Sequence, residues 1–114
     1  MKRQQISLRL PKAIVRQAEL VARELGVSYS GYVNLVLIKW VPKLFKMNML
    51  KLPPIKGLLD SRTAVYLCDE ALRHVERLVD YGFNWSFIAQ QALLMEIRHG
   101  DKNDLRRFKK WLKE

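Results

Sequence analysis

At 114 residues, the chain is long enough for one small domain, or for two very small units that share a core. Its 21 Lys and Arg residues against 11 Asp and Glu give a formal net charge of +10, which favours a polyanionic partner: nucleic acid first, an anionic membrane surface second. The single cysteine, Cys68, excludes an intrachain disulfide and a cysteine-based metal site. Because no apolar leader or membrane-length apolar run is visible, we expect a cytoplasmic, nucleoid-associated protein without a membrane partner.

The first predicted element is a strand over residues 5–10. Polar and apolar residues alternate strictly through QISLRL, and Pro11 ends the alternation. This alternation predicts a strand with one apolar face and one polar face. Because a lone strand of this length is not stable, it needs a partner strand.

Two helices are predicted next. Apolar residues recur with helical spacing from Ile14 to Leu25, and Gly26 is a typical C-terminal stop. Ser28 or Ser30 suits the N-cap of the second helix. That helix is expected to end near Val41 or Pro42, because proline interrupts a helix.

Residues 42–61 are predicted to form a packed linker. Pro53 and Pro54 exclude a continuous helix there, and the segment is too apolar for disorder. A short amphipathic turn within it would use Leu44, Phe45, Met49 and Leu50.

The order of strand, helix, glycine and helix then returns over residues 63–97. Gly26-Val27-Ser28-Tyr29-Ser30 is matched in place by Gly82-Phe83-Asn84-Trp85-Ser86, and similar apolar spacings follow both stretches. We therefore predict an internal repeat. The remaining tail predicts a short basic amphipathic helix, capped by Asp101 or Asn103 and docked through Leu105, Phe108 and Leu112, with Trp111 beside them.

These features resemble the ribbon-helix-helix family of Arc-type and CopG-type repressors. The likeness covers residues 4–41 well and 62–97 more loosely. It implies a mainly α fold with one short two-stranded antiparallel β-ribbon, an intramolecular ribbon-helix-helix pseudo-dimer with a C-terminal basic helix. The corresponding organisation is a first repeat (1–41), a packed linker (42–61), a second repeat (62–98) and a basic C-terminal helix (99–114).

Independent physical reasoning supports two units in one fold. A strand and two helices of roughly 40 residues bury too little apolar surface to fold alone. Two such units can pack four helices under a shared ribbon, with both strands taken from one chain.

The resemblance assigns base readout to the outward ribbon residues, because a two-stranded ribbon fits the major groove of B-DNA. Arg can bond guanine and Gln adenine, whereas Ala64 and Tyr66 depart from that pattern, so the second strand is either an asymmetric reader or scaffold. The predicted readout residues are Gln5, Ser7, Arg9, Arg62, Ala64 and Tyr66.

A second set of residues is expected to contact DNA phosphates. Helix N-termini carry free N–H groups and a positive dipole end, and cations add attraction that does not depend on sequence. Plain helix capping is the alternative role for the serines. The predicted phosphate contacts are Lys2, Arg3, Ser28, Tyr29, Ser30, Asn84, Trp85, Ser86, Arg106, Arg107, Lys109 and Lys110.

The sequence thus predicts a sequence-specific double-stranded DNA-binding protein, either a transcriptional repressor or an accessory factor for plasmid transfer or partition. A further copy of the protein on the same DNA is a second expected partner. We expect no enzyme, cofactor or metal, since His74 and His99 lack neighbours at ligand spacing. Two alternatives stay open: an antitoxin-type interaction module that holds a protein through the linker or tail, and, less favoured, an RNA-binding protein.

Overall fold

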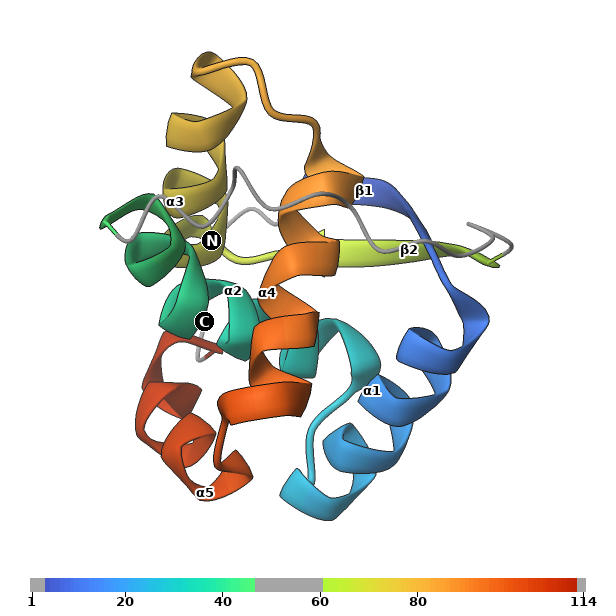
Figure 1. Ribbon diagram of the computed structural model, residues 1–114. Helices are drawn as coiled ribbons and strands as arrows, with labels where there is room; N and C mark the ends of the chain where they lie inside the picture. The colour runs from blue at the N-terminus through green and yellow to red at the C-terminus, as the bar shows by residue number, and fades with distance from the viewer. Residues whose placement is uncertain (1–3, 47–60, 113–114) are drawn as a thin grey trace.

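The fold repeats the order strand, helix, helix. The computed structural model describes residues 4–46 and 61–112. β1 (Gln4–Leu10), α1 (Lys12–Leu25) and α2 (Tyr29–Lys46) are followed by β2 (Ser61–Leu67), α3 (Asp69–Asp80) and α4 (Trp85–His99). The short α5 (Lys102–Leu105) and a 3₁₀ helix, η2 (Arg106–Leu112), complete the described chain. In Figure 1, α2 and α4 lie in the middle of the molecule, next to the ribbon, with α1 and α3 outside them.

The two strands pair with each other as a two-stranded antiparallel sheet, hereafter the ribbon. Gln4 lies opposite Leu67, Ser7 opposite Ala64 at the centre, and Leu10 opposite Ser61. The predicted mainly helical architecture with one short antiparallel ribbon is therefore confirmed.

The ribbon has one buried and one exposed face, as the alternation predicts. Leu8 and Leu10 of β1 are buried, as are Val65 and Leu67 of β2, and Ile6 is partly buried against the same core. Because successive side chains of a strand point to opposite sides, the intervening residues are left on the outer face.

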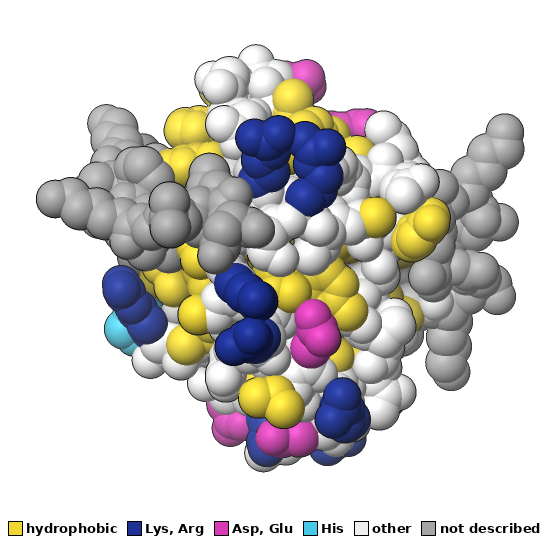
Figure 2. Space-filling view, turned by 90° about the vertical axis from the view of Figure 1, so that its right-hand side faces the viewer, with side chains coloured by type: hydrophobic (Ala, Val, Ile, Leu, Met, Phe, Trp, Pro, Cys, Tyr) yellow, Lys and Arg dark blue, Asp and Glu magenta, His cyan; other side chains and the backbone are white. Residues whose placement is uncertain are grey.

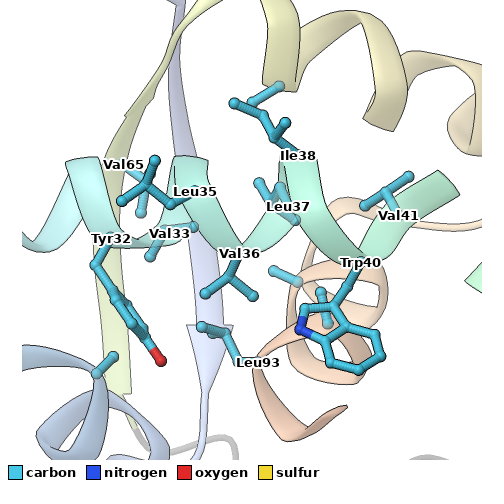
Figure 3. Packing of buried hydrophobic residues seen from close by; sticks show 14 of the residues in the cluster. Tyr32, Val33, Leu35, Val36, Leu37, Ile38, Trp40, Val41, Val65 and Leu93 are labelled. Carbon is cyan, nitrogen blue, oxygen red and sulfur yellow. The ribbon is translucent and has the colours of Figure 1, made fainter. Parts of the chain in front are cut away.

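The core centres on α2, which is apolar on all sides. Every residue from Gly31 to Val41 is buried, which is typical of a helix surrounded by other elements. Figure 3 shows Ile38 on one side of this helix and Tyr32 and Trp40 on the other. The helix therefore contacts α1, α3, α4 and the ribbon at once.

α2 continues through Pro42 to Lys46, so the prediction that this helix ends near Val41 or Pro42 is wrong. A proline inside a helix removes one backbone hydrogen bond and costs about 3 kcal/mol. Val41 and Leu44, on either side of it, are buried in the core, and their burial offsets that cost. Residues 42–46 of the predicted linker are thus helical, while its Met49, Leu50, Pro53 and Pro54 lie outside the described residues.

Glycines end the turns between the helices in both repeats. Gly26 has φ 71° and Gly82 has φ 99°, a backbone conformation that favours glycine. At Gly26 the next residue donates its N–H to the carbonyl of Ala22, which closes the end of α1. The stop predicted at Gly26 is confirmed.

The tail docks through its apolar side, as predicted. Asp101 accepts a hydrogen bond from the N–H of Asn103 at 2.9 Å and so caps α5. Leu105 is fully buried, and Phe108 and Leu112 pack against the core. Only the first turn is α-helical, because the chain continues from Arg106 as a 3₁₀ helix.

A buried charge pair joins the last turns of α4 to α2. The carboxylate of Glu96 accepts hydrogen bonds from Lys39 Nζ at 2.9 Å and from Trp40 Nε1 at 2.7 Å. Lys39 and Glu96 are only 5% and 6% exposed. Gly100 lies so close to this carboxylate that a Cβ there would displace it. Within the described residues, no helix combines the length and apolarity needed to cross a membrane.

Candidate nucleic-acid interface

The six predicted readout residues form one exposed surface, which we call the outer ribbon face. The ribbon register arranges them as three opposite pairs, and every one is exposed. In order along the ribbon, the pairs are Gln5 with Tyr66, Ser7 with Ala64, and Arg9 with Arg62.

Two like charges lie directly opposite each other at one end of this face. Arg9 and Arg62 are a cross-strand pair, and such pairs destabilise a sheet unless an anion lies near them. Figure 2 looks at this end of the molecule and shows dark-blue Lys and Arg side chains gathered at its upper centre, with a second group below them. The arrangement favours a negatively charged ligand on the outer ribbon face.

The two outer edges of the ribbon are fixed to the starts of α2 and α4. Ser86 Oγ accepts a hydrogen bond from the N–H of Arg9 at 3.0 Å. Ser30 Oγ accepts one from the N–H of Tyr66 at 3.2 Å. Because Ser30 and Ser86 are equivalent in the sequence repeat, each half of the chain holds the strand of the other half in the same way.

These contacts place helix N-termini beside the predicted readout residues. The first N–H groups of a helix have no acceptor within it, and they carry the positive end of the helix dipole. α2 begins beside β2 and α4 begins beside β1, so one N-terminus flanks each long edge of the outer ribbon face. The structure thus brings the helix-start members of the predicted phosphate contacts, residues 28–30 and 84–86, next to the ribbon.

The start of α4 opens into a surface cavity of about 530 Å³. Its lining joins the ribbon to the helix and consists of Ser7, Arg9, Asn84, Trp85, Ser86, Phe87 and Gln90. Asn84 caps the helix by accepting from the N–H of Phe87 at 2.7 Å. Gln90 is 3% exposed, and its Nε2 has no hydrogen-bond partner. An unpaired buried donor at such a place is available to an acceptor such as a phosphate oxygen.

The start of α2 differs in the pairing of its polar side chains, although Val27 and Tyr29 there line a cavity of about 340 Å³ on the side of α1. Ser28 Oγ caps the helix by accepting from the N–H of Gly31 at 2.9 Å. The hydroxyls of Tyr29 and Thr63 share a hydrogen bond of 3.0 Å. Burial raises the pKa of Tyr29, and the bond to Thr63 opposes that shift in part. The side chains of this end therefore have partners within the protein.

The predicted cations are not all found beside the ribbon. Lys2 and Arg3 lie outside the described residues. α5 follows the C-terminal end of α4, away from the ribbon in Figure 1. In η2, Arg106 is exposed, Arg107 lies over the ring of Phe108, and Lys109 Nζ is 3.4 Å from the carbonyl of Leu25. The tail thus offers a basic surface separate from the outer ribbon face.

Sequence reasoning missed two amides behind the ribbon, Asn34 and Gln90. Asn34 Nδ2 donates to the carbonyls of Ser30 and Tyr66, both at 2.8 Å, and its Oδ1 accepts from the N–H of Cys68 at 2.9 Å. Each amide lies one helical turn after the serine that holds the ribbon edge. The sequence did contain a signal for both amides, because each is a polar residue inside an otherwise apolar helix.

Comparison with protein-family models, curated protein sequences and solved structures found no match for this chain. The ribbon-helix-helix resemblance therefore stays a prediction. In residues 4–46 and 61–112, no group of three or more His, Cys, Asp or Glu side chains is arranged to hold a metal ion.

Proposed function

We propose that the chain is a sequence-specific double-stranded DNA-binding protein of ribbon-helix-helix type, with both repeats in one chain. The observation that carries this proposal is an exposed polar ribbon face flanked along its two edges by helix N-termini. The reciprocal contacts of Ser86 with Arg9 and of Ser30 with Tyr66 support the pseudo-dimer, because they relate the halves by an approximate two-fold axis.

Each part of this surface has a distinct role in the proposed complex. The ribbon enters the major groove, where Arg9 and Arg62 bond guanine and Gln5 bonds adenine. The starts of α2 and α4 bind backbone phosphates on either side and set the depth and register of the ribbon. Exposed cations such as Arg106 add affinity that is independent of sequence.

The biological role that fits this activity is transcriptional repression, or the marking of a plasmid site for transfer or partition. Such roles often place several bound units side by side, and we propose a further copy of the protein on adjacent DNA as a partner.

Selection of bound sequences from a random duplex pool tests the proposal. An enriched motif is expected, and Arg9→Ala should weaken binding to it by about 1–3 kcal/mol and relax the preference at one base pair. Arg98→Ala, in the last turn of α4 and far from the ribbon, is the matched control and should keep the motif. Equal affinity for all duplexes, or an unchanged motif in Arg9→Ala, would contradict base readout by the ribbon.

An antitoxin-type protein-interaction module is a second candidate. It is favoured by an exposed aromatic pair at the end of α2, where the rings of Phe45 and Tyr81 lie 5.5 Å apart. A cavity of about 180 Å³ beside them is lined by residues of α2 and α3, including His74 and Arg77. If this surface carries the function, Phe45→Ser will abolish the activity in cells while leaving the selected DNA motif unchanged.

A further inference from the structure

We propose that the ribbon binds a non-palindromic duplex in one fixed orientation, with its arginine end over a guanine-containing half-site. This inference rests on the proposed DNA-binding function and deepens it. Two identical subunits present identical ends to DNA, whereas two unequal repeats in one chain need not. Three independent differences between the ends of this ribbon carry the proposal.

The first difference is the chemistry of the readout pairs. In the ribbon register, the pair of Ser7 and Ala64 lies at the centre. The approximate two-fold axis passes through this pair and relates the pair of Arg9 and Arg62 to the pair of Gln5 and Tyr66. One end therefore presents two guanidinium groups, and the other presents an amide and a phenol.

The second difference is the charge of the helix that follows each strand. α1 starts just beyond the arginine end, and its first turn holds Lys12 and no acidic residue. α3 starts just beyond the other end, and its first turn holds Asp69 and Glu70. Among the described residues, the attraction for phosphate is therefore stronger at the arginine end.

The third difference is the state of the two flanking helix starts. Ser86, which holds the backbone of Arg9, lines the open cavity at α4, where Gln90 Nε2 has no partner. Ser30, which holds the backbone of Tyr66, lies at the start of α2, where the polar side chains are paired within the protein. A phosphate at α4 gains a buried donor that α2 does not offer, because the amide of Asn34 is fully bonded.

Because of these differences, the two orientations of the protein on a given DNA site differ in affinity. Arg bonds the O6 and N7 acceptors of guanine, and the amide of Gln bonds the N6 and N7 groups of adenine. Reversing the duplex would place Arg9 and Arg62 over the bases that suit Gln5 and Tyr66. Each mismatched pair costs roughly fivefold to 150-fold in affinity, so two of them select one orientation.

The experiment starts from the motif selected from a random duplex pool by the full chain. Two symmetrised duplexes are then made, each repeating one half of that motif as a palindrome. We expect the original duplex to bind roughly tenfold or more tightly than either palindrome. Arg9→Gln and Arg62→Gln should each relax the motif in the same half, while Arg98→Gln, the matched control, leaves both halves unchanged.

The outcomes separate the two proposals. A pool without any enriched motif overturns the proposed function, and with it this inference. A palindromic motif, or a palindrome that binds as tightly as the original duplex, supports DNA readout but overturns the fixed orientation. If Arg9→Gln and Arg62→Gln relax the motif in opposite halves, the fixed orientation is also overturned, because the two arginines would then lie over different half-sites.

Discussion

The two halves of the molecule, residues 4–46 and 61–99, share the order strand, helix, helix but differ in how their buried polar side chains are hydrogen-bonded. In both halves a serine one residue inside the second helix holds the opposite strand. One turn later, Asn34 of the first half is fully hydrogen-bonded, whereas Gln90 of the second half keeps an unpaired Nε2. The amide in the first half is thus paired within the protein, whereas the amide in the second half lines a cavity next to the ribbon with its donor unpaired.

A proline removes one of the equivalent hydrogen bonds from the second half. Asn34 accepts from the backbone N–H of Cys68, at the head of α3. The equivalent residue at the head of α1 is Pro11, which has no N–H to donate. The amide oxygen of Gln90 therefore has no backbone donor of this kind in the first half, whereas the unpaired atom, Nε2, is a donor that the proline does not account for. The difference shows that one residue in a strand-to-helix turn can remove a hydrogen bond between that turn and the second helix of the other half.

The halves also differ where they meet. Trp40 and Glu96 lie at the same distance, ten residues, after Ser30 and Ser86, and they contact each other. One half thus contributes an indole donor and the other a carboxylate that also pairs with Lys39. Two indoles or two carboxylates at these equivalent positions could not form this hydrogen bond, because it needs one donor and one acceptor.

The largest expected effect on stability is at the contact of Glu96 with Lys39 and Trp40. Glu96→Ala leaves the Lys39 ammonium buried without its main counter-charge, because Asp104 lies farther away at 3.8 Å. We expect a loss of about 3–5 kcal/mol in the free energy of unfolding, measured by urea denaturation. Trp40→Phe removes only one hydrogen bond to the same carboxylate and should cost less. An equal or smaller loss for Glu96→Ala than for Trp40→Phe would contradict the role of this charge pair.

The next effect compares the two amides directly. Asn34→Ala leaves the buried N–H of Cys68 without an acceptor and should destabilise the protein by about 1–3 kcal/mol in the same measurement. Gln90→Leu removes an unpaired buried donor, so we expect it to be neutral or stabilising. Its affinity for the selected DNA should nevertheless fall. A clear loss of stability in Gln90→Leu would show that this amide has a structural partner.

A smaller effect is expected at the ribbon edges. Ser30→Ala and Ser86→Ala each remove one hydrogen bond from an edge that water can reach, and each should cost about 0.5–1.5 kcal/mol. Similar losses for the two variants would sharpen the two-fold relation between the halves. A loss confined to one of them would break it.

The smallest effect is a dependence on alkaline pH that belongs to the first half. Burial raises the pKa of Tyr29 and, more strongly, that of Tyr32, to which the charge of Glu96 also contributes. Below pH about 10, the ordinary tyrosine value, both phenols are neutral in the folded and unfolded chains. Above it the unfolded chain ionises first, so stability falls as pH rises. Urea denaturation from pH 9 to about 11 should show this fall in the free energy of unfolding, and Tyr32→Phe should make the fall shallower. The equivalent residues in the second half, Trp85 and Ile88, do not titrate.

Local patterns in the sequence determined much of this protein. The alternation over residues 5–10 fixed which side of β1 is exposed, because side chains of a strand alternate with period two. The spacing of apolar residues predicted the helices, and Gly26 ended α1 as expected because glycine adopts positive φ without strain. The internal repeat predicted a second strand, and the partner of β1 is indeed β2.

Only the tertiary structure decided how the polar groups are paired. α2 passes through Pro42 because Val41 and Leu44 are buried by neighbouring elements. Helix propensities, which depend on the local sequence alone, do not include this burial. The same is true of Ser30 and Ser86, whose oxygen atoms bond strands of the opposite half, and of the unpaired amide of Gln90. These contacts join residues far apart in the chain, and their energies depend on burial and distance, which a single sequence does not specify.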